Sequence, residues 1–151
     1  MLYSTLFKII IPVTIWFLSV TRKDIENGML ISILFAIIEA THYKLFHDYW
    51  YTTIEQFCVN VVSYPIIIKW YSMYIPYYLV RIFCFPLVIW IYEFIAGHYL
   101  VWTFGKNKAW QYDETQEYVY FGGKINLNYW FRWILLACSI EVFNLLIRMI
   151  H

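Results

Sequence analysis

The sequence IFCFPLVIWIYEFIAGHYLVWTFG occupies residues 82–105 and decides the fold. Glu93 is the only residue in this stretch that carries a formal charge. A helix rises about 1.5 Å per residue, so a helix of this length exceeds the roughly 30 Å hydrocarbon core of a bilayer. The stretch therefore predicts a transmembrane helix.

The composition of the whole chain agrees with this prediction. Of the 151 residues, 62% are hydrophobic, 23% are aromatic and only 14% are charged. Soluble domains carry about 45–50% apolar and about 25% charged residues. These figures predict one integral membrane domain and exclude a disordered chain, a collagen-like fibre and a disulfide scaffold. The net charge of +1 gives no basic surface for nucleic acid.

Apolar stretches on both sides of residues 82–105 predict further spans of an all-α helical bundle. They cover residues 1–20, 28–46, 54–69 and 129–150. The first is expected to be a retained helix, because it lacks the small-residue end of a cleaved signal peptide. The third is short and contains Pro65, and residues 70–78 are expected to form an aromatic lip at the membrane surface. The alternative for this region is one long, tilted and broken helix. Five transmembrane helices are therefore predicted, with four as the alternative.

The only polar stretch of any length, residues 106–128, is predicted to be a loop between the last two spans. It is long for a connector without structure, so local structure is expected in it. Lysines and arginines are spread evenly over the two faces of a five-span bundle, so the orientation is undecided. The three isolated cysteines predict buried free thiols.

Three carboxylates, Glu39, Glu93 and Glu141, fall inside predicted spans. Placing an acidic side chain there costs at least about 2.5–3.5 kcal/mol, so each is expected to face the bundle interior or a partner. His42 shares the helix face of Glu39. Gly97 lies four residues from Glu93 and would let a neighbouring helix approach closely.

Two interpretations of these carboxylates stay open. They either hold helices together through hydrogen bonds, or they line a polar cavity that binds a ligand. Glu39-x-x-His42 is half of a di-metal motif, but the chain has no second such pair, so no metal and no other cofactor is predicted. There is no phosphate-binding loop for nucleotide hydrolysis and no catalytic serine or zinc motif.

Four pieces of the second half of the chain occur together in one known family. The pieces are YEFIAG at residues 92–97, FG at 104–105, WQYD at 110–113 and FGGKINL at 121–127, followed by Trp130. In these pieces the chain resembles the small membrane proteins classed as ABC-transporter type IV and their animal relatives, transmembrane protein 229. Gln111 departs from the acidic residue usual in that family. The resemblance implies a multi-span helical protein with a polar loop folded back on the bundle, and no demonstrated reaction.

If the resemblance holds, the recurring residues have physical roles. Gly105 would end its helix in a left-handed cap. Trp110 and Tyr112 would plug the loop into the mouth of the bundle, with Tyr112 or Asp113 bonded to Lys124 or Arg132. The candidate cavity residues are therefore Glu39, His42, Glu93, Gly97, Trp110, Tyr112, Asp113, Lys124, Arg132 and Glu141.

The sequence is compatible with three functions. The first is a non-enzymatic membrane protein that binds or passes a small molecule or lipid. The second, by analogy with sterol isomerases of the emopamil-binding class, is an intramembrane enzyme in which Glu39, His42 and Glu93 work beside Trp90 or Trp102. The third is a structural or accessory subunit. The expected partners are the bilayer, a lipid or small apolar ligand, and further subunits of the same or another chain.

Overall fold

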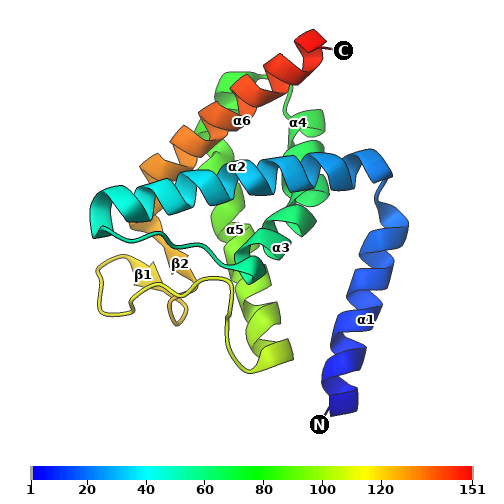
Figure 1. Cartoon of the computed structure of the whole chain (residues 1–151), viewed down its shortest axis with the longest axis vertical. Coiled ribbons are helices and arrows are strands. Elements are labelled where there is room, and N and C mark those ends of the chain that lie inside the picture. Colours follow the sequence, from blue (N-terminus) through cyan, green and yellow to red (C-terminus); the bar gives the residue numbers. More distant parts are fainter. Residues whose placement is uncertain (1, 151) are drawn as a thin grey trace.

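The computed structural model describes residues 2–150, and the side chains of residues 5–146. About 77% of the chain is helical, which confirms the predicted all-α class. The elements are α1 (Leu2–Ser19), α2 (Arg22–His47), α3 (Ile54–Ser63), the π-helical η1 (Tyr64–Lys69), α4 (Trp70–Tyr74), α5 (Tyr78–Phe104), β1 (Val119–Tyr120), β2 (Ile125–Asn126), the 3₁₀-helical η2 (Leu127–Tyr129) and α6 (Trp130–Ile150) (Figure 1).

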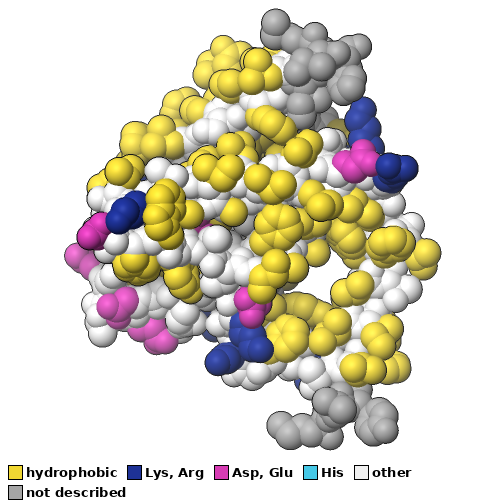
Figure 2. Space-filling view, viewed as in Figure 1, with side chains coloured by type: hydrophobic (Ala, Val, Ile, Leu, Met, Phe, Trp, Pro, Cys, Tyr) yellow, Lys and Arg dark blue, Asp and Glu magenta, His cyan; other side chains and the backbone are white. Residues whose placement is uncertain are grey.

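Three helical segments of the described chain are long and apolar enough to cross a membrane. They are Arg22–His47, Tyr78–Phe104 and Leu127–Leu146. Figure 2 shows apolar side chains spread over the visible face of the helices, with charged side chains in small groups. Thr5–Ser19 is a shorter apolar helix. Three helices therefore have the length and hydropathy that the predicted membrane protein requires, and five crossings stay a prediction.

The helical run of residues 54–74 departs from the predicted boundaries. A third span ending at residue 69 and an aromatic lip over 70–78 were expected, but the helix continues to Tyr74 and only residues 75–77 are non-helical. Pro65 lacks an N–H and would clash with the preceding turn of an α-helix. The wider π turn of η1 accommodates the proline, so the helix is not broken there. The chain breaks instead at Ile75, which is extended before Pro76.

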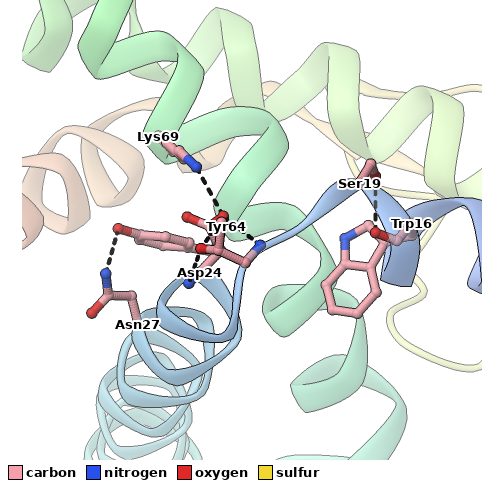
Figure 3. Close-up of polar contacts among 7 residues, drawn as sticks. Trp16, Ser19, Asp24, Asn27, Tyr64 and Lys69 are labelled. Atoms are coloured by element: carbon pink, nitrogen blue, oxygen red, sulfur yellow. Dashed lines mark hydrogen bonds and ion pairs between the residues drawn. The ribbon is translucent and has the colours of Figure 1, made fainter.

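The corner between α1 and α2 is fastened to η1 by polar side chains. Thr21 and Asp24 form a capping box at the start of α2, and Asp24 is only 5% exposed. Figure 3 shows Lys69 reaching toward Asp24, where its Nζ lies 2.8 Å from Oδ2. Beside them, Asn27 donates a hydrogen bond to the hydroxyl of Tyr64 at 3.1 Å. This cluster fixes the direction in which α2 leaves α1.

The helices do not form a parallel bundle. In Figure 1, α2 lies across the direction of α5, whereas α1 runs beside the lower end of α5. The Lys8 ammonium donates to the carbonyl of Trp102 at 2.9 Å, and the Tyr99 hydroxyl donates to the carbonyl of Lys8 at 2.7 Å. Trp16 donates to the carbonyl of Val62 at 3.3 Å. Figure 2 shows an opening between α1 and the rest of the chain, so α1 is held by few contacts.

A small apolar core joins the other helices. It draws on α2, η1, α5 and α6, and its buried members are Ile31, Ile67, Ile68, Phe85, Leu136, Ala137 and Ile140. The cysteines lie outside it. They are free thiols, as predicted, but Cys58 is exposed and Cys84 and Cys138 are only partly buried, so the predicted burial was wrong. A free thiol behaves as a small hydrophobic group, so it can lie against hydrocarbon on the outside of a helix as well as in a protein core.

Glu141 holds α6 to the start of α5. Both its carboxylate oxygens accept from the Arg81 guanidinium at 2.6 Å, and the two side chains are 16% and 13% exposed. Arg81 also donates to the carbonyl of Ile75 at 2.7 Å. Glu141 therefore links two helices and the 75–77 connection.

We expect Glu141→Ala to lower the free energy of unfolding by about 3 kcal/mol, because it leaves the Arg81 charge buried and unpaired. The exposed pair of Arg22 and Glu26 supplies the control, since Arg22→Ala should cost less than about 0.5 kcal/mol. Denaturation in mixed detergent micelles measures both values. Equal effects of the two substitutions would show that the Arg81 pair does not fasten α5 to α6.

Candidate functional site: two neighbouring cavities

The polar loop after α5 folds back onto the helices. α5 ends at Gly105 in the left-handed conformation, with φ 77°, as predicted. The side-chain oxygen of Asn107 then accepts from the backbone N–H groups of Ala109 and Trp110, at 3.1 and 3.3 Å. β1 and β2 pair antiparallel later in the loop. The local structure expected in residues 106–128 is therefore present, and it returns the chain toward α5.

Glycine at position 97 makes room for this loop. A Cβ there would lie 3.1 Å from the Cγ and Cδ atoms of Lys124. The close approach that was predicted for Gly97 is therefore made by the aliphatic stem of Lys124 and not by a neighbouring helix. The indole N–H of Trp110 donates to the carbonyl of Lys124 at 2.9 Å, which holds the two arms of the loop together.

Tyr112 connects the loop to the middle of α5. Its hydroxyl donates to Oε1 of Glu93 at 2.6 Å, and Glu93 is only 6% exposed. Burial, followed by the nearby Glu93 carboxylate, raises the pKa of Tyr112 well above its usual value. The hydroxyl therefore keeps its proton and acts as a donor. Glu93, which was predicted to lie within a span, is therefore hydrogen-bonded to a residue of the loop.

The partners predicted for Tyr112 and Asp113 were wrong. Lys124 donates instead to the carbonyl of Phe121 at 2.7 Å, and the Arg132 guanidinium lies over the Tyr129 ring at 4.1 Å. Asp113 is exposed and accepts hydrogen bonds from the backbone and the side chain of Thr115, which lower its pKa. The loop turns outward at Asp113, so that this carboxylate lies outside the site.

Behind Glu93 lies an inner cavity of about 50 Å³. Four buried polar atoms on its walls have no hydrogen-bond partner among the described residues: Glu93 Oε2, Gln56 Oε1, Asn60 Nδ2 and Trp133 Nε1. Leaving such an atom unpaired costs about 1–3 kcal/mol. The remaining walls are mainly apolar, with Phe35, Ile89 and Leu136 among them. Residues that line the inner cavity therefore carry buried donors and acceptors whose hydrogen-bonding capacity is unused.

Sequence reasoning missed three of these four residues. Gln56 and Asn60 lie four residues apart, so both occur on one face of α3, and the residues between them are apolar. That spacing was an available signal. Trp133 gave no comparable signal, because one tryptophan among many in an aromatic-rich chain is expected at the membrane surface.

An outer pocket of about 120 Å³ lies on the other side of Tyr112. Its polar and aromatic walls come from α2, the loop, η2 and α6, and comprise Glu39, His42, Tyr43, Tyr112, Tyr129, Arg132 and Trp133. Glu39 accepts a hydrogen bond from the Thr52 hydroxyl at 2.8 Å. Phe35, Trp133 and Leu136 line both the inner cavity and the outer pocket. The two spaces are therefore neighbours.

The structure divides the predicted site residues into groups. Glu93 and Trp110 line the inner cavity, Glu39, His42, Tyr112 and Arg132 line the outer pocket, and Gly97 and Lys124 support the loop. Asp113 and Glu141 lie elsewhere. Of the residues considered for proton transfer, Glu39 and His42 line the outer pocket together, Glu93 lines the inner cavity, and the Lys8 ammonium lies over the Trp102 ring.

Within the described side chains, no group of three or more His, Cys, Asp or Glu residues could hold a metal ion. A comparison of the chain with family models, curated proteins and solved structures finds no match. The resemblance to the ABC-transporter type IV proteins therefore stays a prediction from the motifs. The proposed function below therefore rests on the residues that line the two cavities.

We expect Gly123→Ala to release the loop. Gly123 has φ 71°, and a Cβ there would collide with the carbonyl oxygen of Tyr112 and the Gln111 side chain. Gly105→Ala is the matched control, because Gly105 has φ 77° but no neighbouring atom within 4 Å of an added Cβ. Both variants carry backbone strain, but only Gly123→Ala also places a Cβ against Tyr112.

Trypsin digestion of the protein in detergent measures this release at the loop lysines. Cleavage there should be severalfold faster in Gly123→Ala than in Gly105→Ala. Equal cleavage rates in the two variants would mean that the loop is not held against α5 at Tyr112.

Proposed function

We propose that this protein is a multi-pass membrane protein that binds or passes a small molecule or lipid at a polar site within the membrane. Glu93 is the central residue of that site. The proposed activity is binding without ATP hydrolysis and without a catalysed reaction. Membership of the ABC-transporter type IV group is part of the proposal, and the four sequence pieces named above support it.

The contrast between two buried carboxylates supports binding over helix attachment as the role of Glu93. Both oxygens of Glu141 accept from Arg81, as expected for a group that joins helices. Glu93 uses one oxygen for Tyr112, and its other oxygen is buried with no hydrogen-bond partner among the described residues, in a side chain that lines the inner cavity. A carboxylate that served attachment alone would gain stability from a second partner. The free oxygen is the observation on which the proposal rests.

We further propose that five helical segments cross the membrane. α2, α5 and the Leu127–Leu146 segment have the length and hydropathy for it. α1 is apolar and runs beside α5, and residues 54–74 are one helical run because the π turn absorbs Pro65. Five crossings put the two chain ends on opposite sides of the bilayer, whereas four crossings put them on the same side.

The Glu93→Gln variant tests the proposed site. It preserves the shape of the side chain and can still accept from Tyr112, but it replaces the unpartnered carboxyl oxygen by an amide NH₂ group. Protein purified in mild detergent should carry a co-purified molecule in stoichiometric amount, detected by native mass spectrometry. We expect Glu93→Gln to lose that molecule while its melting temperature stays close to that of the original protein.

Glu141→Gln is the control, because it alters the helix-joining carboxylate and leaves the inner cavity intact. It should lower the melting temperature and retain the bound molecule. The proposal fails if the original protein carries no bound molecule. It also fails if Glu93→Gln retains that molecule in full, or if Glu93→Gln resembles Glu141→Gln in losing stability alone.

A further inference from the structure

Two opposite charges line the outer pocket without pairing with each other. Glu39 on α2 and Arg132 on α6 both contribute to its walls. The ion pairs among the described residues are Arg22–Glu26, Lys44–Asp48, Lys69–Asp24 and Arg81–Glu141, so neither residue belongs to one. Glu39 and Arg132 each contact an uncharged group instead of an opposite charge. Thr52 donates to one oxygen of Glu39, and the Tyr129 ring lies under the Arg132 guanidinium.

Both charges are accessible to a bound molecule, since Arg132 is exposed and Glu39 is half-buried. Here the two charges lie on different helices, with a pocket of about 120 Å³ between them. The chemical complement of such a pocket is a molecule that carries both charges itself.

We propose that the outer pocket binds the head group of a zwitterionic phospholipid, with its amine or ammonium group at Glu39 and its phosphate at Arg132. An arginine fork suits a phosphate because it can donate two parallel hydrogen bonds to it. The ring of Tyr43 lines the same pocket and offers a π face to the cationic group. This inference rests on the proposed function, since it names the kind of molecule that the membrane site recognises.

The apolar walls point to a lipid and not to a free zwitterion in water. Phe35, Ile38 and Leu136 complete the pocket. Beyond it, the outer surfaces of α2 and α6 are apolar, with Ile37 59% and Leu135 52% exposed. Acyl chains can lie along these surfaces while the head group occupies the pocket. A free amino acid or glycerophosphate ester would leave that apolar surface unused.

Binding to short-chain phospholipids tests the inference. The protein in detergent micelles is titrated with dihexanoyl phosphatidylethanolamine, which carries both charges, and with dihexanoyl phosphatidylglycerol, which carries the phosphate alone. Glycerophosphoethanolamine supplies the head group without chains. Native mass spectrometry gives the affinities. We expect phosphatidylethanolamine to bind roughly tenfold or more tightly than phosphatidylglycerol, and glycerophosphoethanolamine to bind weakly.

Charge-removing variants show which residue recognises which charge. Glu39→Gln should weaken phosphatidylethanolamine binding roughly tenfold and leave phosphatidylglycerol binding unweakened. Arg132→Gln should weaken both lipids, and Arg132→Lys, which keeps the charge, should restore part of the loss. Glu114→Gln and Lys106→Gln remove exposed charges outside the pocket, and should change neither affinity by more than about twofold.

Three results would overturn the inference. They are equal affinity for the two lipids, no change of affinity in Glu39→Gln or Arg132→Gln, and equally tight binding of the head group without chains. The last result would show a zwitterion site for a water-soluble molecule. These failures are distinguishable from failure of the proposed function. If only the head-group inference fails, Glu93→Gln still loses its co-purified molecule. If the proposed function fails, Glu93→Gln and the original protein carry the same bound molecules.

Discussion

The hydroxyl of Tyr112 donates to the buried carboxylate of Glu93, and the arrangement of both cavities depends on this contact. The bond draws the polar loop onto the middle of α5. In that position Tyr112 forms a wall of the outer pocket, and Trp110 forms a wall of the inner cavity. The left-handed cap at Gly105 and the backbone hydrogen bonds to Asn107 start the loop in the direction that the bond requires.

The three carboxylates in the helices have three different surroundings. Glu141 is fully paired with Arg81 and joins helices. Glu93 shares its interactions between the loop and the inner cavity. Glu39 has one hydroxyl donor and faces the outer pocket opposite the unpaired Arg132. Under the proposed function, the two interpretations that the sequence left open apply to different residues, with Glu141 attaching helices and Glu93 and Glu39 binding a ligand.

Local patterns were sufficient for part of this structure. The apolar run of residues 82–105, the glycine that ends it and the polar loop after it all depend on short-range chemistry, and they were predictable from sequence. The partners that side chains find on other helices or in the loop were not predictable from sequence. The pairing of Asp24 with Lys69, and of Glu93 with Tyr112, depends on which surfaces pack together, and no local spacing encodes that.

The same limit explains why the predicted end of the third span, at residue 69, was wrong. A proline in an apolar run is expected to end or kink a helix, because the standard turn cannot accommodate its ring. The π turn that keeps residues 54–74 continuous is stabilised by packing of Ile67 and Ile68 into the core. Gln56 and Asn60, on the preceding turns of this run, line the inner cavity. Tertiary packing therefore decided both the helix boundary and the cavity lining.

The central claim is that Tyr112 and Glu93 interact directly and thereby hold the loop over the inner cavity. A double-mutant cycle with Tyr112→Phe and Glu93→Met, measured as free energies of unfolding in mixed micelles, tests it most directly. The account predicts a coupling energy of about 1–2 kcal/mol between the two positions. Effects that add to within about 0.3 kcal/mol would contradict it.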